Sequence, residues 1–100
     1  MATNKNALLR YLAIDRRIRV KYLPPPTLED LVEYVSGKLD GTKVSKRTIQ
    51  LDIENMRYNN ALAAYAPIVA IRGGGRFVNN TYSYEDPEYN FIKALIKNHE

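Results

Sequence analysis

The chain of 100 residues contains no cysteine and only one histidine, His99. Without cysteine there is no disulfide, no thiol nucleophile and no thiolate metal ligand, which suits a reducing compartment. His99 lies in the terminal Lys-Asn-His-Glu, and no Ser/His/Asp or metal-ligand grouping can be assembled around it. Glu85, Asp86 and Glu88 flank a proline and are typical of a solvated turn. We therefore expect neither an enzyme nor a cofactor or metal site.

The chain also lacks a long apolar run. Its first 17 residues are interrupted by charges at Lys5, Arg10, Asp15 and Arg16, so they do not form a secretion signal. No segment of about twenty apolar residues, the length that spans a bilayer, occurs in the sequence. We expect a soluble, unsecreted, cytoplasmic protein of one domain without a membrane partner.

Positive charge is in excess, with 15 Lys and Arg against 11 Asp and Glu and a net charge of +4. The excess is unevenly placed. Residues 1–76 contain 13 basic and 7 acidic residues, whereas residues 77–100 contain 2 basic and 4 acidic residues. A basic body with a mildly acidic tail indicates that the body has an anionic partner.

Three amphipathic helices are predicted in the first two-thirds of the chain. Periodic apolar residues predict the first over residues 4–21, and Pro24–Pro26 end it because proline lacks an amide hydrogen and clashes with the preceding turn. Thr27 is a typical N-cap for the second helix. Ser45 is the predicted N-cap of a third helix that extends to about Leu62.

After Pro67 the pattern becomes extended. Ile68–Ile71 predict a strand, Gly73–Gly75 a tight turn and Phe77–Tyr84 a returning strand. Tyr89–Lys97 predict a final helix. The order of three helices, a two-stranded β-hairpin wing and a C-terminal helix predicts an α+β, mainly α, fold of the winged helix-turn-helix type.

The third predicted helix, VSKRTIQLDIENMR at residues 44–57, has two contrasting faces. Ile49, Ile53 and Met56 follow the helical period and predict a buried seam. The adjoining outward sector contains basic and amide side chains: Lys46, Arg47, Gln50 and Arg57. In a helix-turn-helix, side chains near the N-terminus of the second helix reach base edges in the major groove. The pattern favours DNA binding; the alternative is a set of charges that only solvate an exposed face.

The predicted hairpin tip, Arg72-Gly73-Gly74-Gly75-Arg76, is a second candidate. Two arginines around a turn made only of glycine place positive charge on a thin loop, which suits a minor groove or a phosphate backbone. The alternative is a surface hairpin kept soluble by its charge. The glycines do not indicate a P-loop, because no helix beginning with Lys-Ser/Thr follows them.

The third helix resembles the recognition helix of the N-terminal winged helix-turn-helix of WYL-domain transcriptional regulators, a DeoR-like class of bacterial proteins. The signature of that family reads approximately Ser-x-Arg-Thr-Ile-x-Arg-Asp-Ile-x-x-Leu. The matching residues are Ser45, Arg47, Thr48, Ile49, Asp52 and Ile53. Met56 stands where leucine is usual, and Leu51 where arginine is common. Segments from Asn4 to Tyr89 closely resemble Bacteroidetes members, so the resemblance covers nearly all of the chain.

The resemblance implies sequence-specific binding of double-stranded DNA by a transcriptional regulator. The expected DNA contacts are Ser45, Lys46, Arg47, Thr48, Gln50 and Arg57 in the third helix, with Arg72 and Arg76 in the wing. We expect Asp52 to fix local geometry through a hydrogen bond or an ion pair. Family members continue into a ligand-sensing WYL domain. We therefore expect a DNA-binding domain at residues 1–86, and a helix or linker at 87–100 that would lead to an effector domain absent from this chain.

A protein-interaction module is the alternative function, because winged helices also serve as docking and dimerisation domains. The last predicted helix carries an apolar set that can pack on its own domain or form a homodimer with a second copy: Tyr89, Phe91, Ile92, Leu95 and Ile96. We expect most of five tyrosines to lie at the edge of the core: Tyr11, Tyr22, Tyr34, Tyr58 and Tyr65. The salt dependence of binding distinguishes the two functions, since DNA binding weakens steeply as the salt concentration rises.

Overall fold

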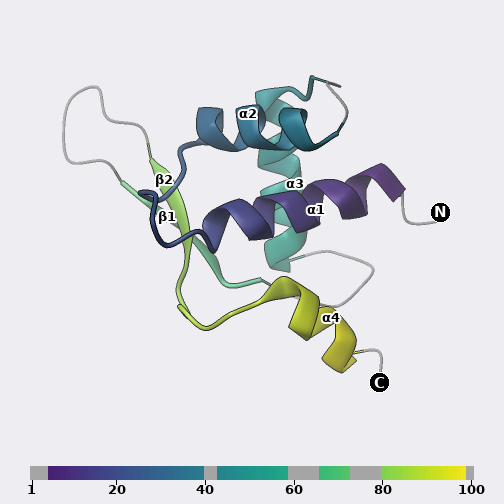
Figure 1. Ribbon diagram of the computed structural model, residues 1–100, viewed down its shortest axis with the longest axis vertical. Helices are drawn as coiled ribbons and strands as arrows, with labels where there is room; N and C mark the ends of the chain where they lie inside the picture. The colour runs from purple at the N-terminus through teal and green to yellow at the C-terminus, as the bar shows by residue number, and fades with distance from the viewer. Residues whose placement is uncertain (1–4, 40–42, 59–65, 73–79, 99–100) are drawn as a thin grey trace.

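The computed structural model describes residues 5–39, 43–58, 66–72 and 80–98 (Figure 1). The elements follow in the order α1 (Lys5–Ile18), α2 (Leu28–Lys38), α3 (Lys46–Tyr58), β1 (Ile68–Ile71), β2 (Thr81–Tyr84) and α4 (Phe91–Asn98). The two strands form one antiparallel sheet. This order confirms the predicted winged helix fold, with three helices, a hairpin and a C-terminal helix. Within the described ranges, no helix is long and apolar enough to cross a membrane.

Helix α1 ends three residues earlier than predicted. The amide of Arg19 still donates to the carbonyl of Asp15 at 3.0 Å, but the amide of Val20 donates to the carbonyl of Arg17 at 3.3 Å. This tighter bond, to a residue only three positions back, closes the helix. Nη2 of Arg17 then donates to the carbonyl of Pro24 at 3.3 Å, which ties the proline segment to the end of α1.

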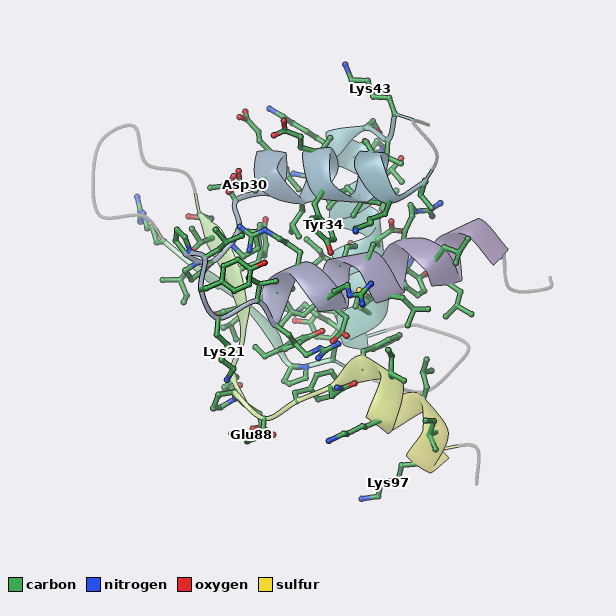
Figure 2. The ribbon with its side chains drawn as sticks, viewed as in Figure 1. Lys21, Asp30, Tyr34, Lys43, Glu88 and Lys97 are labelled. Atoms are coloured by element: carbon green, nitrogen blue, oxygen red, sulfur yellow. The ribbon has the colours of Figure 1, made fainter. Side chains whose placement is uncertain are left out.

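Helix α2 begins at a capping box, which confirms Thr27 as its N-cap. Oγ1 of Thr27 accepts from the amide of Asp30 at 3.1 Å, and the carboxylate of Asp30 accepts from the amide of Thr27 at 3.0 Å. Two amides that have no partner within the helix are satisfied in this way. From the same helix, the side chain of Tyr34 points toward α1 (Figure 2).

One hydrophobic core joins all four helices to the hairpin. The fully or nearly fully buried apolar residues are Tyr11, Ala13, Ile14, Leu31, Val35, Ile49, Ile53, Met56, Ala66, Ile68 and Phe91. The predicted seam of α3 is therefore confirmed as part of the core. The rings of Tyr11 and Phe91 meet edge to face, with centroids 6.3 Å apart, and this contact places α4 against α1.

The prediction that most of the tyrosines lie at the core edge is partly wrong. Tyr11 is buried and Tyr34 is half-buried, but the exposed fractions of Tyr22 and Tyr58 are 87% and 62%. Tyr22 lies in the non-helical segment that leads to the prolines, and Tyr58 lies in the last described turn of α3, opposite the buried seam. Neither ring can reach the core from these positions. Tyr65 is outside the described residues.

The hairpin is attached to the start of α2. Its register pairs Ile68 with Tyr84, Val69 with Ser83, Ala70 with Tyr82 and Ile71 with Thr81. On the other edge of β2, the amide of Tyr82 donates to the carbonyl of Pro26 at 2.9 Å, and Thr27 forms an isolated bridge with Thr81. The hairpin therefore lies beside the N-terminus of α2 (Figure 1). The predicted glycine turn lies outside the described residues.

Helix α4 begins two residues later than predicted, because Asn90 is its N-cap. Oδ1 of Asn90 accepts from the amide of Lys93 at 3.1 Å. Phe91 is fully buried, whereas the exposed fractions of Ile92 and Ile96 are 44% and 59%. One face of α4 thus packs on the domain and the other is uncovered.

The buried carboxylate of Asp15 joins α1 to the hairpin and to α4. Its Oδ1 accepts from the hydroxyl of Tyr84 at 2.6 Å and from the amide of Phe91 at 3.1 Å, and its Oδ2 accepts from Nε of Arg19 at 2.9 Å. A buried charge is tolerated only with such partners. Burial and the nearby carboxylate of Asp15 raise the pKa of Tyr84 well above its usual range, so the hydroxyl remains a donor.

We expect Asp15→Asn to lower the free energy of unfolding by about 2–4 kcal/mol, because it removes the charge that these donors solvate. Urea denaturation followed by circular dichroism measures the change, with the exposed Glu85→Gln as a control that also removes one negative charge. Equal midpoints for Asp15→Asn and wild type would contradict a central role for this carboxylate.

Candidate nucleic-acid interface

The first turn of α3 is organised by Ser45, which is confirmed as its N-cap. Oγ of Ser45 accepts from the amide of Thr48 at 3.1 Å and lies 3.0 Å from Oγ1 of Thr48. The carbonyl of Ser45 accepts from the amide of Ile49 at 3.2 Å. Ser45 is exposed and Thr48 is half-buried. Two hydroxyls therefore stand together at the start of the helix, where a phosphate is favoured by the helix dipole.

Lys46, the first residue of α3, pairs with α2. Its Nζ lies 2.9 Å from Oε1 of Glu29, and the two side chains are 60% and 64% exposed. Ion pairs this exposed contribute about 0–1 kcal/mol, because water and salt screen them. The ammonium of Lys46 can therefore exchange its carboxylate partner for another anion at little cost.

One face of α3 is not covered by the other helices. Figure 1 shows α1 and α2 on the same side of α3, where the apolar seam is buried. The exposed side chains of the opposite face are Arg47, Gln50, Leu51, Glu54 and Tyr58. Arg47 forms no ion pair with any described residue. This face thus presents a cation, an amide, an apolar group and a carboxylate within about three turns of helix.

The side chain of Asp52 points to the other side and locks α3 onto α1. Arg10 binds its carboxylate through two bonds, Nε to Oδ2 at 2.6 Å and Nη2 to Oδ1 at 3.1 Å. The hydrogen bond to Asp52 raises the pKa of Arg10. Burial raises the pKa of Asp52 even though Arg10 acts in the opposite direction. Asp52 thus holds the helix in place, as expected for a residue that fixes local geometry.

Arg57 lies near the C-terminal end of α3, beside the hairpin. Its guanidinium carbon is 4.6 Å from the centre of the Tyr58 ring, within the range of a cation–π contact. A groove separates this part of α3 from the hairpin and is lined by Gln50, Ile53, Glu54, Arg57, Tyr58, Ala70 and Tyr82. The structure therefore brings Arg57 and Gln50 together at one groove.

The wing residues are only partly described. Arg72 directly follows β1 and is exposed. Arg76, the second predicted arginine of the tip, lies outside the described residues. In the described ranges, no three His, Cys, Asp or Glu side chains are grouped to hold a metal ion.

Sequence reasoning missed two acidic neighbours of the predicted site. Glu54 lies four residues after Gln50 and seven after Arg47, so the helical period alone could have placed it on the same face. Glu29 is 17 residues from Lys46 in the chain. Only the packing of α2 against α3 brings that pair together, and no local pattern indicates it.

Comparison with known proteins agrees with this architecture. The family model for the N-terminal winged helix domain of WYL domain-containing proteins matches residues 6–84. The chain belongs to this family. The matched region contains α2, α3, both strands of the hairpin and all of α1 except Lys5. No curated protein and no solved structure matches the chain. A WYL-family winged helix domain indicates a DNA-binding module that acts in regulation.

We expect Arg10→Met to destabilise this winged helix domain by about 3 kcal/mol near pH 7, since it leaves the Asp52 carboxylate buried without its partner. Loss of Arg10 should raise the pKa of Asp52 further. A raised carboxyl pKa favours the folded state at low pH, and this contribution is lost as the pH rises through the folded pKa. The difference in the free energy of unfolding between wild type and Arg10→Met should therefore become smaller as the pH falls.

Urea midpoints at about pH 7 and about pH 4, which bracket the titration of a raised carboxyl group, measure this change. Arg16→Met, at an exposed position of the same helix, is the matched control. A deficit of the same size at both pH values would show that Arg10 acts through packing alone.

Proposed function

We propose that the protein binds double-stranded DNA in a sequence-specific manner as the DNA-binding part of a transcriptional regulator, with α3 in the major groove. The observation that carries this proposal is the uncovered face of α3, which holds Arg47 and Gln50 opposite a fully buried seam. Membership in a winged helix family of WYL domain-containing proteins supports it. Winged helix domains of this kind are regulatory modules, and we assign no catalytic residue.

Direct readout is assigned to Arg47 and Gln50. A guanidinium pairs in a bidentate manner with O6 and N7 of guanine, and a carboxamide pairs with N6 and N7 of adenine. Each such pair contributes about 1–3 kcal/mol of discrimination against a wrong base. Arg47 suits this role because no described residue neutralises it.

Phosphate binding is assigned to the two ends of the same surface. Ser45 and Thr48 offer hydroxyls at the start of α3, and Lys46 offers an ammonium whose present partner is weakly held. Arg57, beside the hairpin, and the wing arginines Arg72 and Arg76 would contact the backbone or the minor groove. Such contacts fix the orientation of the protein but read no sequence.

A second candidate is homodimerisation through α4, which the exposed side chains of Ile92 and Ile96 favour. A dimer would suit two half-sites on DNA, so the two candidates are compatible. An apolar contact between copies should respond little to salt, in contrast with binding to phosphates.

We expect random-sequence duplex DNA to bind with a dissociation constant of about 1–100 μM at physiological salt. The affinity should fall as salt rises. Lys46→Ala/Arg47→Ala should weaken binding at least about tenfold and lower the salt slope by about 0.9 for each phosphate that the variant no longer neutralises. Fluorescence anisotropy at two salt concentrations measures both effects.

The control for this experiment is Lys97→Ala. Figure 2 shows the side chain of Lys97 projecting from α4, at the end of the molecule away from α2. This variant should bind nearly as wild type does. No binding by wild type at low salt would contradict DNA binding and leave the interaction module as the function.

We expect Glu29→Gln to tighten binding to random-sequence DNA about two- to fivefold, because Lys46 then no longer exchanges a carboxylate for a phosphate. Glu33→Gln removes the same charge from an exposed position one turn further along α2 and is the matched control. The gain should disappear when Lys46→Ala is added. An equal gain in both single variants would mean that only the net charge matters.

A further inference from the structure

Two residues at the centre of the exposed face of α3 have no part in the functions assigned so far. Leu51 is 46% exposed, and Glu54 is also exposed. They are three residues apart, so they are neighbours on the helix surface. Arg47 precedes Leu51 by four residues and Gln50 precedes Glu54 by four, which makes two adjacent rows of two side chains each.

Neither side chain contributes to the packing of the residues that the structure describes. Leu51 belongs neither to the core nor to the partly buried apolar residues that pack against it. Glu54 forms no hydrogen bond or ion pair with any described side chain. An exposed leucine and an exposed carboxylate therefore lie beside the two residues proposed to read bases.

The carboxylate is unfavourable on a surface that only follows a phosphate backbone, because like charges repel. It becomes favourable where it can accept a hydrogen bond from a base. In the major groove, the N4 amino group of cytosine is the donor that Glu accepts, and the C5-methyl group of thymine is the group that an apolar side chain contacts.

We propose that Leu51 and Glu54 determine which bases the protein prefers: Leu51 packs against the methyl group of a thymine, and Glu54 accepts from the N4 amino group of a cytosine. This assignment rests on the proposed DNA-binding function. Three residues along a helix rise about 4.5 Å, close to the spacing of about 3.4 Å between successive base pairs. The preferred site should therefore contain the thymine and the cytosine at neighbouring positions.

The first experiment selects binding sites from a random duplex library with wild type, Leu51→Ala and Glu54→Gln. Both positions are exposed, so the variants should fold, which circular dichroism verifies. Glu54→Gln should replace the preference for cytosine by one for adenine, since a carboxamide pairs with adenine. Its affinity for the wild-type site should fall about tenfold. Leu51→Ala should lose the preference for thymine.

The second experiment replaces the selected thymine by deoxyuridine, which removes only the methyl group. The affinity of wild type should fall about fourfold, the value of one buried methyl-sized group. Leu51→Ala should bind both duplexes equally. The matched controls are Leu9→Ala, a leucine 42% exposed on α1, and Glu88→Gln, an exposed acidic residue in the segment that precedes α4 (Figure 2). Both should keep the base preference of wild type.

Different results overturn different conclusions. If wild type selects a sequence but the two variants keep the same base preferences, the roles of Leu51 and Glu54 are wrong and DNA binding stands. The same holds if wild type does not distinguish thymine from deoxyuridine. If wild type binds no DNA in the library, the proposed function fails and this inference fails with it.

Discussion

The arrangement of the hairpin and of α4 depends on one buried carboxylate, that of Asp15. An ionised group without water is strongly unfavourable unless donors replace its hydration shell. Tyr84, Phe91 and Arg19 supply three such donors from β2, from the start of α4 and from the turn that follows α1. The wing and the last helix are thus held at fixed positions because they complete the solvation of a charge that α1 places in the interior.

The two ion pairs that α3 forms with described residues contain the same kinds of group, but their burial gives them different roles. The carboxylate of Asp52 is almost fully buried and receives two bonds from Arg10, so breaking the pair would leave a charge in the interior. Lys46 and Glu29 are both mostly in water, so their pairing is weak and exchangeable. The buried pair sets the orientation of α3. The exposed pair leaves an ammonium available at the end of the surface proposed to meet DNA.

Local signals in the sequence predicted the starts of α2 and α3 and the seam of α3. Thr27 and Ser45 cap their helices through bonds to amides three residues away, and the seam of α3 repeats with the helical period. The interactions that assemble the elements were not predictable in this way. Arg10 and Asp52 are 42 residues apart, and Asp15 and Phe91 are 76 residues apart. Such pairs form because the elements pack together in space, and the spacing of residues along the chain does not indicate which elements will pack.

The same distinction applies to the candidate interface. The basic and amide residues of α3 follow from a short motif, and the structure leaves Arg47 and Gln50 uncovered. The contact between Glu29 and Lys46 could not be predicted from the sequence. It depends on the packing of α2 on α3, which neither helix specifies alone.

The proline segment also protects an edge of the sheet against aggregation. Strand β2 has an outer edge that a strand of another molecule could pair with. On this edge, the amide of Tyr82 already donates a hydrogen bond to the carbonyl of the fully buried Pro26. Because prolines carry no amide hydrogen, Pro24–Pro26 offer no donor row on which a further strand could grow. The segment that connects α1 to α2 therefore also stops the sheet from extending at the edge of β2.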